Sequence, residues 1–252
     1  MIRSKKSTAA VFAALALFVV PSAAIASLAG KIVRVEAEET ISGDSGFWEI
    51  LLPPSPSDPF MWSLPSPINV YSTANPSNQL GRIDSLQVKL DGDPQVILNF
   101  AVVAGNTDTN FCIQSGTVSF SPLVNPLAVA SAAITVTDND GDGAVLTGLE
   151  PGIRAYEARY NGSSVYADLI QTPLIATSFS SASLSDRMPP VTGFLVIPGP
   201  VSSIESEFCF TLSANDSASG TSQFTVVPEP TTWALLGTGL IALAAVARRR
   251  RG

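Results

Sequence analysis

Residues 27–227 alternate short β-branched or aromatic runs with turns rich in Gly, Pro and Asn, and no stretch among them has a helical period. Leu86, Val88 and Leu90, for example, alternate with polar residues. A period of two places every second side chain on one face of a strand, so one face can be buried and the other solvated. About ten such strands predict an all-β domain, an antiparallel β-sandwich of jelly-roll or immunoglobulin-like type, with the strand order left open.

Three segments refine this expectation. Residues 96–103 are apolar on both faces, which predicts a central strand covered on each side. Six of the fifteen residues in 53–67 are proline, which lacks a backbone donor, so we expect an extended loop there. Residues 178–190 are rich in serine and are predicted to form another loop.

The clearest hairpin joins residues 153–160 to residues 163–170 through Asn161-Gly162. Asn-Gly accepts the positive φ angles of a two-residue type I′ turn. That register places Glu157, Arg159 and Tyr166 on the solvated face, with Tyr166 exposed. An exposed aromatic ring beside polar groups suits a sugar ring, so these three residues are the candidate sugar-binding residues. The alternative is that the aromatic side chain takes part in core or loop packing.

One turn carries a motif with a physical mechanism, Asp138-Asn139-Asp140-Gly141-Asp142-Gly143. Alternate carboxylates with glycine at the sixth position resemble the start of an EF-hand loop, so Asp138, Asp140 and Asp142 are candidate ligands for weakly bound Ca²⁺. The twelfth position holds Leu149 and not the expected glutamate, and the flanks favour strands over helices. The alternative is a plain acidic turn.

The chain contains two cysteines, Cys112 and Cys209, each between apolar residues. In an exported protein they can form one disulfide, and the alternative is two separate buried thiols. No catalytic residue is predicted, because the chain has no histidine to act as a base for a serine such as Ser45. Glu205 and Glu207 have the spacing of neighbours on one strand face, and we interpret them as a solvated surface pair.

Two terminal segments indicate export. Basic residues, an apolar run over 9–20 and Ala24-Ile25-Ala26 predict a signal peptide over residues 1–26, since twelve apolar residues are short for a membrane span. At the other end an uncharged run over 231–247 precedes four arginines. Its 17 residues would cover roughly 25 Å as a helix, which predicts a transmembrane helix with the arginines in the cytoplasm.

The region between these segments is strongly acidic. Residues 27–230 hold seven basic and 21 acidic residues, a net charge of −14. A surface of this charge repels phosphate groups, so nucleic acid is excluded as a partner.

The C-terminal segment 228–252 resembles a PEP-CTERM sorting signal. Its parts are Pro228, Glu229 and Pro230, the apolar span, and the cluster Arg248, Arg249, Arg250 and Arg251. The resemblance implies that an exosortase reads and processes the segment, and that the bearer belongs to a bacterium with an exopolysaccharide matrix. The alternative is an ordinary single-pass anchor.

The domain order is therefore predicted as a signal peptide (1–26), a β-sandwich ectodomain (27–227) and the sorting signal. We expect a non-enzymatic surface or matrix protein. The Sec machinery would export it, the inner membrane would tether it with the ectodomain in the periplasm, and it would then pass to the cell surface or extracellular matrix. The alternative function is a carbohydrate- or Ca²⁺-binding module. No cofactor other than weakly bound Ca²⁺ is expected.

Overall fold

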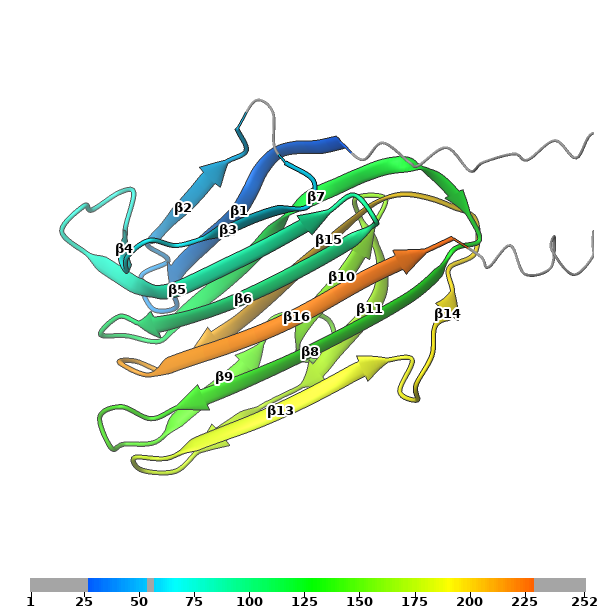
Figure 1. The fold of residues 1–252 in the computed structure, drawn as a ribbon. Coiled ribbons are helices and arrows are strands. Elements are labelled where there is room, and N and C mark those ends of the chain that lie inside the picture. The colour runs from blue at the N-terminus through cyan, green and yellow to red at the C-terminus, as the bar shows by residue number, and fades with distance from the viewer. Residues whose placement is uncertain (1–26, 54–56, 229–252) are drawn as a thin grey trace, which may run out of the picture.

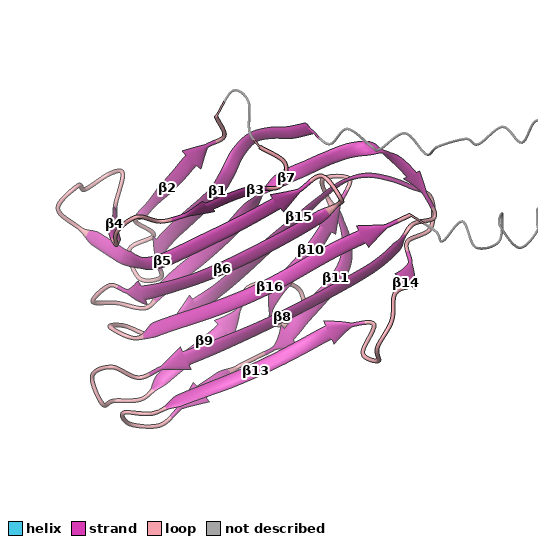
Figure 2. Ribbon diagram, viewed as in Figure 1, coloured by secondary structure: helices cyan, strands magenta, loops and turns pink. Residues whose placement is uncertain are grey.

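The structure is a computed structural model, and it describes residues 27–53 and 57–228. The predicted signal peptide, most of the sorting motif, the apolar run and the arginine cluster lie outside these residues. Within the described part every regular element is a strand (Figure 2). None of the described residues belongs to a helix long and apolar enough to cross a membrane.

The strands form two antiparallel sheets that pack face to face (Figure 1). In sheet A the strand order is β11-β10-β15-β7-β1-β2; in addition, β9 pairs with β15, and β12 pairs with β9. Its strands are β1 (Ser27–Glu39), β2 (Ser45–Leu51), β7 (Thr109–Val124), β9 (Ala144–Gly148), β10 (Arg154–Tyr160), β11 (Ser164–Gln171), β12 (Leu174–Ala176) and β15 (Pro200–Leu212).

In sheet B the strand order is β13-β8-β16-β6-β5-β3; in addition, β14 pairs with β8, and β4 pairs with β5. Its strands are β3 (Phe60–Ser63), β4 (Ile68–Tyr71), β5 (Gln79–Asp91), β6 (Gln95–Ala104), β8 (Leu127–Thr137), β13 (Ser181–Met188), β14 (Leu195–Val196) and β16 (Ser217–Val227). The architecture is consistent with the predicted β-sandwich.

Aromatic rings from both sheets meet in the core. Phe100 of β6 packs with its ring centroid 5.0 Å from that of Phe208 and 5.9 Å from that of Phe210, both on β15. Phe111 on the neighbouring strand β7 extends the group. The last two strands are essential to this core, because β15 lies between β7 and β10 and β16 lies between β6 and β8. The C-terminal part of the domain therefore completes both sheets.

The predicted register of the β10–β11 hairpin is wrong by one residue. Tyr160 pairs with Ser164, so the loop has three residues and not two. A second shift lies between Ala158 and Arg159, because Arg159 pairs with Val165 but Ala158 pairs with Ala167. This leaves Tyr166 as an extra residue of β11, in the manner of a β-bulge. The sequence favoured a two-residue turn because Asn161 and Gly162 both take positive φ angles, as the structure confirms.

Two further expectations fail in sheet B. The serine-rich segment predicted as a loop contains β13, an edge strand whose alternating small side chains give little hydrophobic signal. The central strand β6 is covered on one face only, and Ile97 and Val103 on its other face stay partly exposed. Within the proline-rich segment, β3 forms only a short strand at the edge of sheet B, where missing donors are tolerated.

Candidate functional site

The turn between β8 and β9 contains the aspartates of the predicted Ca²⁺ loop. Asp138 is buried, and its carboxylate accepts hydrogen bonds from the backbone N–H groups of Gly141, at 3.1 Å, and Phe179. Asp140 accepts the N–H of Asp142 at 3.3 Å. Gly141 has a φ of 96°, a conformation that favours glycine. The backbone thus shapes the turn, while Asp140 and Asp142 stay at the surface.

Asp216, which the sequence motif does not contain, joins this turn from the β15–β16 connection. Ser217 at the start of β16 pairs with Thr137 at the end of β8, so Asp216 lies beside Asp138. Carboxylate oxygens of Asp138, Asp142 and Asp216 lie within 4.8 Å of one another. Asp216 is completely buried. We call Asp138, Asp140, Asp142 and Asp216 the aspartate cluster.

The negative charge of the aspartate cluster has no basic partner among the described residues. A hydrogen bond with Asp140 and the charge of that residue raise the pKa of Asp142. Burial raises the pKa of Asp216. Burial also opposes ionisation of Asp138. Hydrogen bonds from backbone N–H groups, above all that of Phe179, outweigh the effect of burial, so the pKa of Asp138 is lowered. Convergent carboxylates of this kind suit a hard divalent cation.

The arrangement differs from an EF-hand at its far end. Leu149, at the twelfth position, is 47% exposed. Glu150 forms an ion pair with Arg159 at 3.5 Å, so it is directed to another cluster. The fourth carboxylate of the cluster comes instead from Asp216, 78 residues beyond Asp138 in the chain. The pairing of β16 with β8 brings it there, and no local spacing could reveal it.

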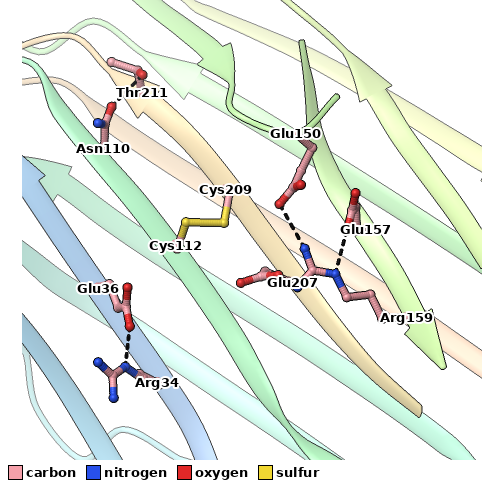
Figure 3. The surroundings of a disulfide bond; sticks show 10 residues. All are labelled: Arg34, Glu36, Asn110, Cys112, Glu150, Glu157, Arg159, Glu207, Cys209 and Thr211. Atoms are coloured by element: carbon pink, nitrogen blue, oxygen red, sulfur yellow. Dashed lines mark hydrogen bonds and ion pairs between the residues drawn. A yellow bond between two sulfur atoms is a disulfide. The ribbon is translucent and has the colours of Figure 1, made fainter. Parts of the chain in front are cut away.

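The second acidic group surrounds Arg159 on the outer face of sheet A (Figure 3). Arg159 Nε donates to Glu157 Oε2 at 2.6 Å, Nη2 lies 3.5 Å from Glu150 Oε1, and Nη1 forms an ion pair with Glu207. Glu157 and Glu207 face each other across β10 and β15 and are 4% and 9% exposed. We call these four residues the Arg159 cluster.

The Arg159 cluster gathers three carboxylates around one guanidinium. Burial raises the pKa of Glu150 to about 7, and the negative charge of Glu157 adds to this effect. Burial also raises the pKa of Glu207, although Arg159 works in the opposite direction. Glu150 is therefore partly protonated at neutral pH. The carboxylates of Glu150, Glu157 and Glu207 lie within 4.8 Å of one another, and Arg159 forms an ion pair with each of the three.

The pair Glu205 and Glu207 is buried, which corrects its interpretation as a solvated surface pair. Glu205 is 8% exposed and accepts a hydrogen bond from Thr117 Oγ1 at 2.9 Å. The reason is the central position of β15, whose side chains are covered by those of β7 and β10 on either side. Both glutamates therefore take part in structural interactions within sheet A.

Cys112 and Cys209 form a disulfide, the first of the two alternatives that the sequence left open (Figure 3). They are opposite each other on β7 and β15, with Cα atoms 4.2 Å apart. The bond links residues 97 positions apart in the chain. It therefore ties the last part of the domain to the centre of sheet A.

The structure does not assemble the predicted sugar-binding residues. Glu157 and Arg159 are together, but the bulge turns Tyr166 into the sandwich. Its ring stacks on Phe224 of sheet B at 5.4 Å, and its hydroxyl donates to the carbonyl of Ala128 at 2.7 Å. Burial raises the pKa of Tyr166 to about 12. The prediction of an exposed Tyr166 is wrong because the extra residue in β11 reverses the side on which it lies.

The outer face of sheet B differs from that of sheet A in charge and shape. Its three central strands, β6, β8 and β16, contain no Lys, Arg, Asp or Glu. A hollow of about 550 Å³ opens on this face beside Ile97 and Thr221. A second hollow of about 350 Å³ shares Ile97 and includes Asn99 and Trp62. Hydroxyl and amide groups make up much of the lining of both hollows, with Asp186 and Arg187 at the first and Lys89 at the second.

The last described residue, Pro228, follows directly on the end of β16. It begins the Pro-Glu-Pro motif, and residues 226–251 match the family described as the PEP-CTERM protein-sorting motif. The chain carries a PEP-CTERM sorting motif. Such a motif marks an exported protein that is anchored in the membrane, sorted by an exosortase and passed to the surface. The match covers the tail and leaves the function of the ectodomain unassigned.

Other comparisons give little information about the β domain. No curated protein matches the chain. The structure of infectious bursal disease virus Gx strain is 10% identical over 80% of this chain, with a TM-score of 0.29, and this chain covers 57% of that one. The Gt strain structure is also 10% identical, over 81% of this chain and 67% of the other, with a TM-score of 0.17. Similarity at this level supports no functional argument.

Proposed function

We propose that this PEP-CTERM protein is a non-enzymatic component of the cell surface or of the exopolysaccharide matrix. In this proposal the Sec machinery exports the chain, a C-terminal helix tethers it to the inner membrane with the β domain in the periplasm, and an exosortase cuts near the Pro228 motif. The observation that carries the proposal is the position of the motif. Strand β16 ends at Val227, so a cut after that residue would leave both sheets complete.

The N-terminal side supports the same order of events. Ser27, the first residue that the structure describes, already pairs with Ser119 of β7. Cleavage at the predicted signal-peptide site would therefore keep every described residue of β1 in the mature domain, as a cut after Val227 would keep all of β16. A non-enzymatic role is supported by the lack of histidine and by Arg159, which already neutralises part of the charge of the nearby glutamates.

Intact mass and cell fractionation test the proposal. In cells with the exosortase, we expect a released form that begins at Ser27 and ends near the motif. In cells without it, the chain should remain in the membrane and keep Gly252. Replacing Pro228, Glu229 and Pro230 by alanine should have the same effect as loss of the exosortase, while Asp93→Asn, in an exposed turn, should be processed normally. A released form that still ends at Gly252 would contradict exosortase processing.

In the matrix, the two hollows on the outer face of sheet B are the surface proposed to contact polysaccharide. Hydroxyl and amide side chains in these hollows, such as those of Thr221 and Asn99, can exchange hydrogen bonds with sugar hydroxyls. We expect the exported protein to be retained on the producer's own polysaccharide, and Asn99→Ala with Thr221→Ala to weaken retention. Equal retention of this variant, or no retention on any glycan of a broad panel, would reject the contact.

A second candidate function is weak Ca²⁺ binding by the aspartate cluster. The favouring observation is that Asp216 adds a buried carboxylate to Asp138 and Asp142, and none of the basic residues that the structure describes forms an ion pair with them. We expect millimolar Ca²⁺ to raise the Tm of the protein, and Asp216→Asn to abolish that rise. Asp93→Asn removes the same charge from an exposed Asp-Gly turn and should leave the rise intact. An unchanged Tm in Ca²⁺ would reject this function.

A further inference from the structure

One end of the sandwich exposes a group of large apolar side chains. Val124 is 70% exposed, Val191 72% and Leu195 50%, and Phe194 and Val196 are also exposed. We call these five residues the end patch. Soluble domains usually bury such side chains, and a contiguous exposed group marks a contact surface.

Three members of the end patch, Val124, Leu195 and Val196, lie on neighbouring segments, and Val191 and Phe194 precede Leu195 in the chain. Strand β14, which contains Leu195 and Val196, pairs with the start of β8. Val124 comes just before the turn into β8 and pairs with Pro200, a few residues after β14. The backbone bond from Asn125 N to Gly199 O, at 3.0 Å, closes the same turn. The patch is therefore built from the β7–β8 turn and the β14 segment.

The end patch lies beside the point where the chain leaves the sandwich. Leu127 of β8 pairs with Val196 on one side and with Val227, the last residue of β16, on the other. Two strand spacings, roughly 10 Å, thus separate β14 from the end of β16. Figure 1 shows both at the same end of the sandwich.

Very little chain connects this end to the apolar run. Residues 228–230 alone separate Val227 from the uncharged run 231–247. Three extended residues reach at most about 10 Å. If the run lies in a bilayer, this end of the sandwich stays within roughly 10 Å of the membrane surface.

Charge favours the same orientation. The segments around the end patch, residues 121–127, 161–163 and 189–200, contain no acidic residue although the ectodomain is strongly acidic, and the guanidinium of Arg187 donates to the Gly193 carbonyl among them at 3.1 Å. The aspartate cluster lies at the other end of β8, roughly 30 Å away for a strand of this length. An anionic lipid surface repels carboxylates, so the segments around the end patch can approach it at a lower electrostatic cost than the acidic turns of the domain.

We propose that the end patch rests on the lipid surface while the protein is tethered. The apolar side chains would enter the boundary between headgroups and acyl chains, as in other interfacial segments. The proposal rests on the proposed function, because it needs the tail to be in the membrane. The β5–β6 turn at the same end carries Asp91 and Asp93, so the sandwich tilts with its β14 side toward the lipid.

A consequence concerns the sorting motif. A sandwich seated on the bilayer keeps Pro228 at the membrane surface and limits how far the motif can move away from it. After cleavage the same patch leaves the lipid and becomes free to contact water or matrix.

The test uses the full-length protein in vesicles of phosphatidylcholine, with and without phosphatidylglycerol. Both native cysteines are in the disulfide. Single added cysteines can therefore carry a fluorophore that lipid-borne nitroxides quench. We expect quenching for Leu195→Cys and Val191→Cys, two exposed positions where the substitution leaves the core intact. Ile41→Cys, 82% exposed in the β1–β2 turn at the opposite end, should not be quenched.

A label at Leu240→Cys, within the apolar run, separates the two proposals. Quenching at Leu240 without quenching at Leu195 and Val191 would overturn the lipid-facing patch and leave the tether intact. No quenching at Leu240 would overturn both. Disulfide cross-linking of Leu195→Cys between two copies, in place of quenching, would make the patch a self-association surface and also overturn the proposal.

Discussion

Replacing Glu150 by glutamine should stabilise the protein at pH 8 and leave its stability at pH 4 nearly unchanged. In the folded protein the pKa of Glu150 is raised from 4.5 to about 7. Burial is the main cause, and the negative charge of Glu157 adds to it. Between these pH values the folded chain keeps a proton that the unfolded chain has released. Stability conferred by this group is therefore present at low pH and falls as the pH rises toward 7.

The magnitude follows from the size of the pKa change. At about 1.4 kcal/mol per pH unit, the difference between 4.5 and about 7 corresponds to about 3 kcal/mol of lost stability above pH 7. Glutamine carries no charge, and its carbonyl oxygen can keep the contact with Arg159 Nη2, which lies 3.5 Å from Glu150 Oε1. Glu150→Gln should thus recover up to about 3 kcal/mol at pH 8.

Urea denaturation at pH 4 and pH 8 measures this difference, with the midpoint compared at equal slope. Glu38→Gln is the matched control, because Glu38 is exposed and its substitution removes the same charge. We expect the control to change stability by less than about 0.5 kcal/mol at both pH values. No gain for Glu150→Gln at pH 8, or the same gain at pH 4, would refute the explanation based on burial and repulsion.

The other predictions concern elements that hold the two sheets together. Replacing Cys112 and Cys209 by alanine removes a cross-link over 97 positions and should lower the unfolding free energy by about 2–5 kcal/mol, measured in urea. Reductant should then have no further effect on this variant, and a large further loss would count against the disulfide as its cause. Tyr166→Phe removes the hydroxyl that donates to Ala128 and should cost about 1 kcal/mol, with glycan retention unchanged. Loss of glycan retention in this variant would show that Tyr166 does take part in ligand binding. Gly116→Ala would place a Cβ against the Lys31 carbonyl and should lower the Tm, whereas Ser121→Ala, exposed on the same strand, should not.

The hairpin shows how far local sequence reasoning reaches. Asn161 and Gly162 indicated a turn, and the structure has a turn there with both φ angles positive. The sequence could not reveal the shift of register after Ala158, because it depends on how β10 and β11 fit the neighbouring strand and the opposite sheet. The shifted register places Tyr166 between the sheets, where its partly buried ring packs against the core, and not on the predicted outer face.

The acidic residues show the same limit for the candidate site. Asp138, Asp140 and Asp142 were visible as a motif because their spacing within one turn is local. Asp216 was not, since it reaches the cluster only through the pairing of Ser217 with Thr137 across sheet B. Glu205 and Glu207 had the spacing of surface residues, and only the central position of β15 made them buried.

The sequence by itself determined the class of strands and turns, the two cysteines that could pair, and the sorting motif that follows Val227. These features depend on neighbouring residues, whose geometry the chain imposes within a few bonds. The tertiary structure decided which carboxylates lie close together and which glutamates become buried. It also decided that the exposed apolar residues of β14 lie near the end of β16, where the chain leaves the sandwich. Those outcomes depend on contacts between residues tens of positions apart, which form only when both sheets are assembled.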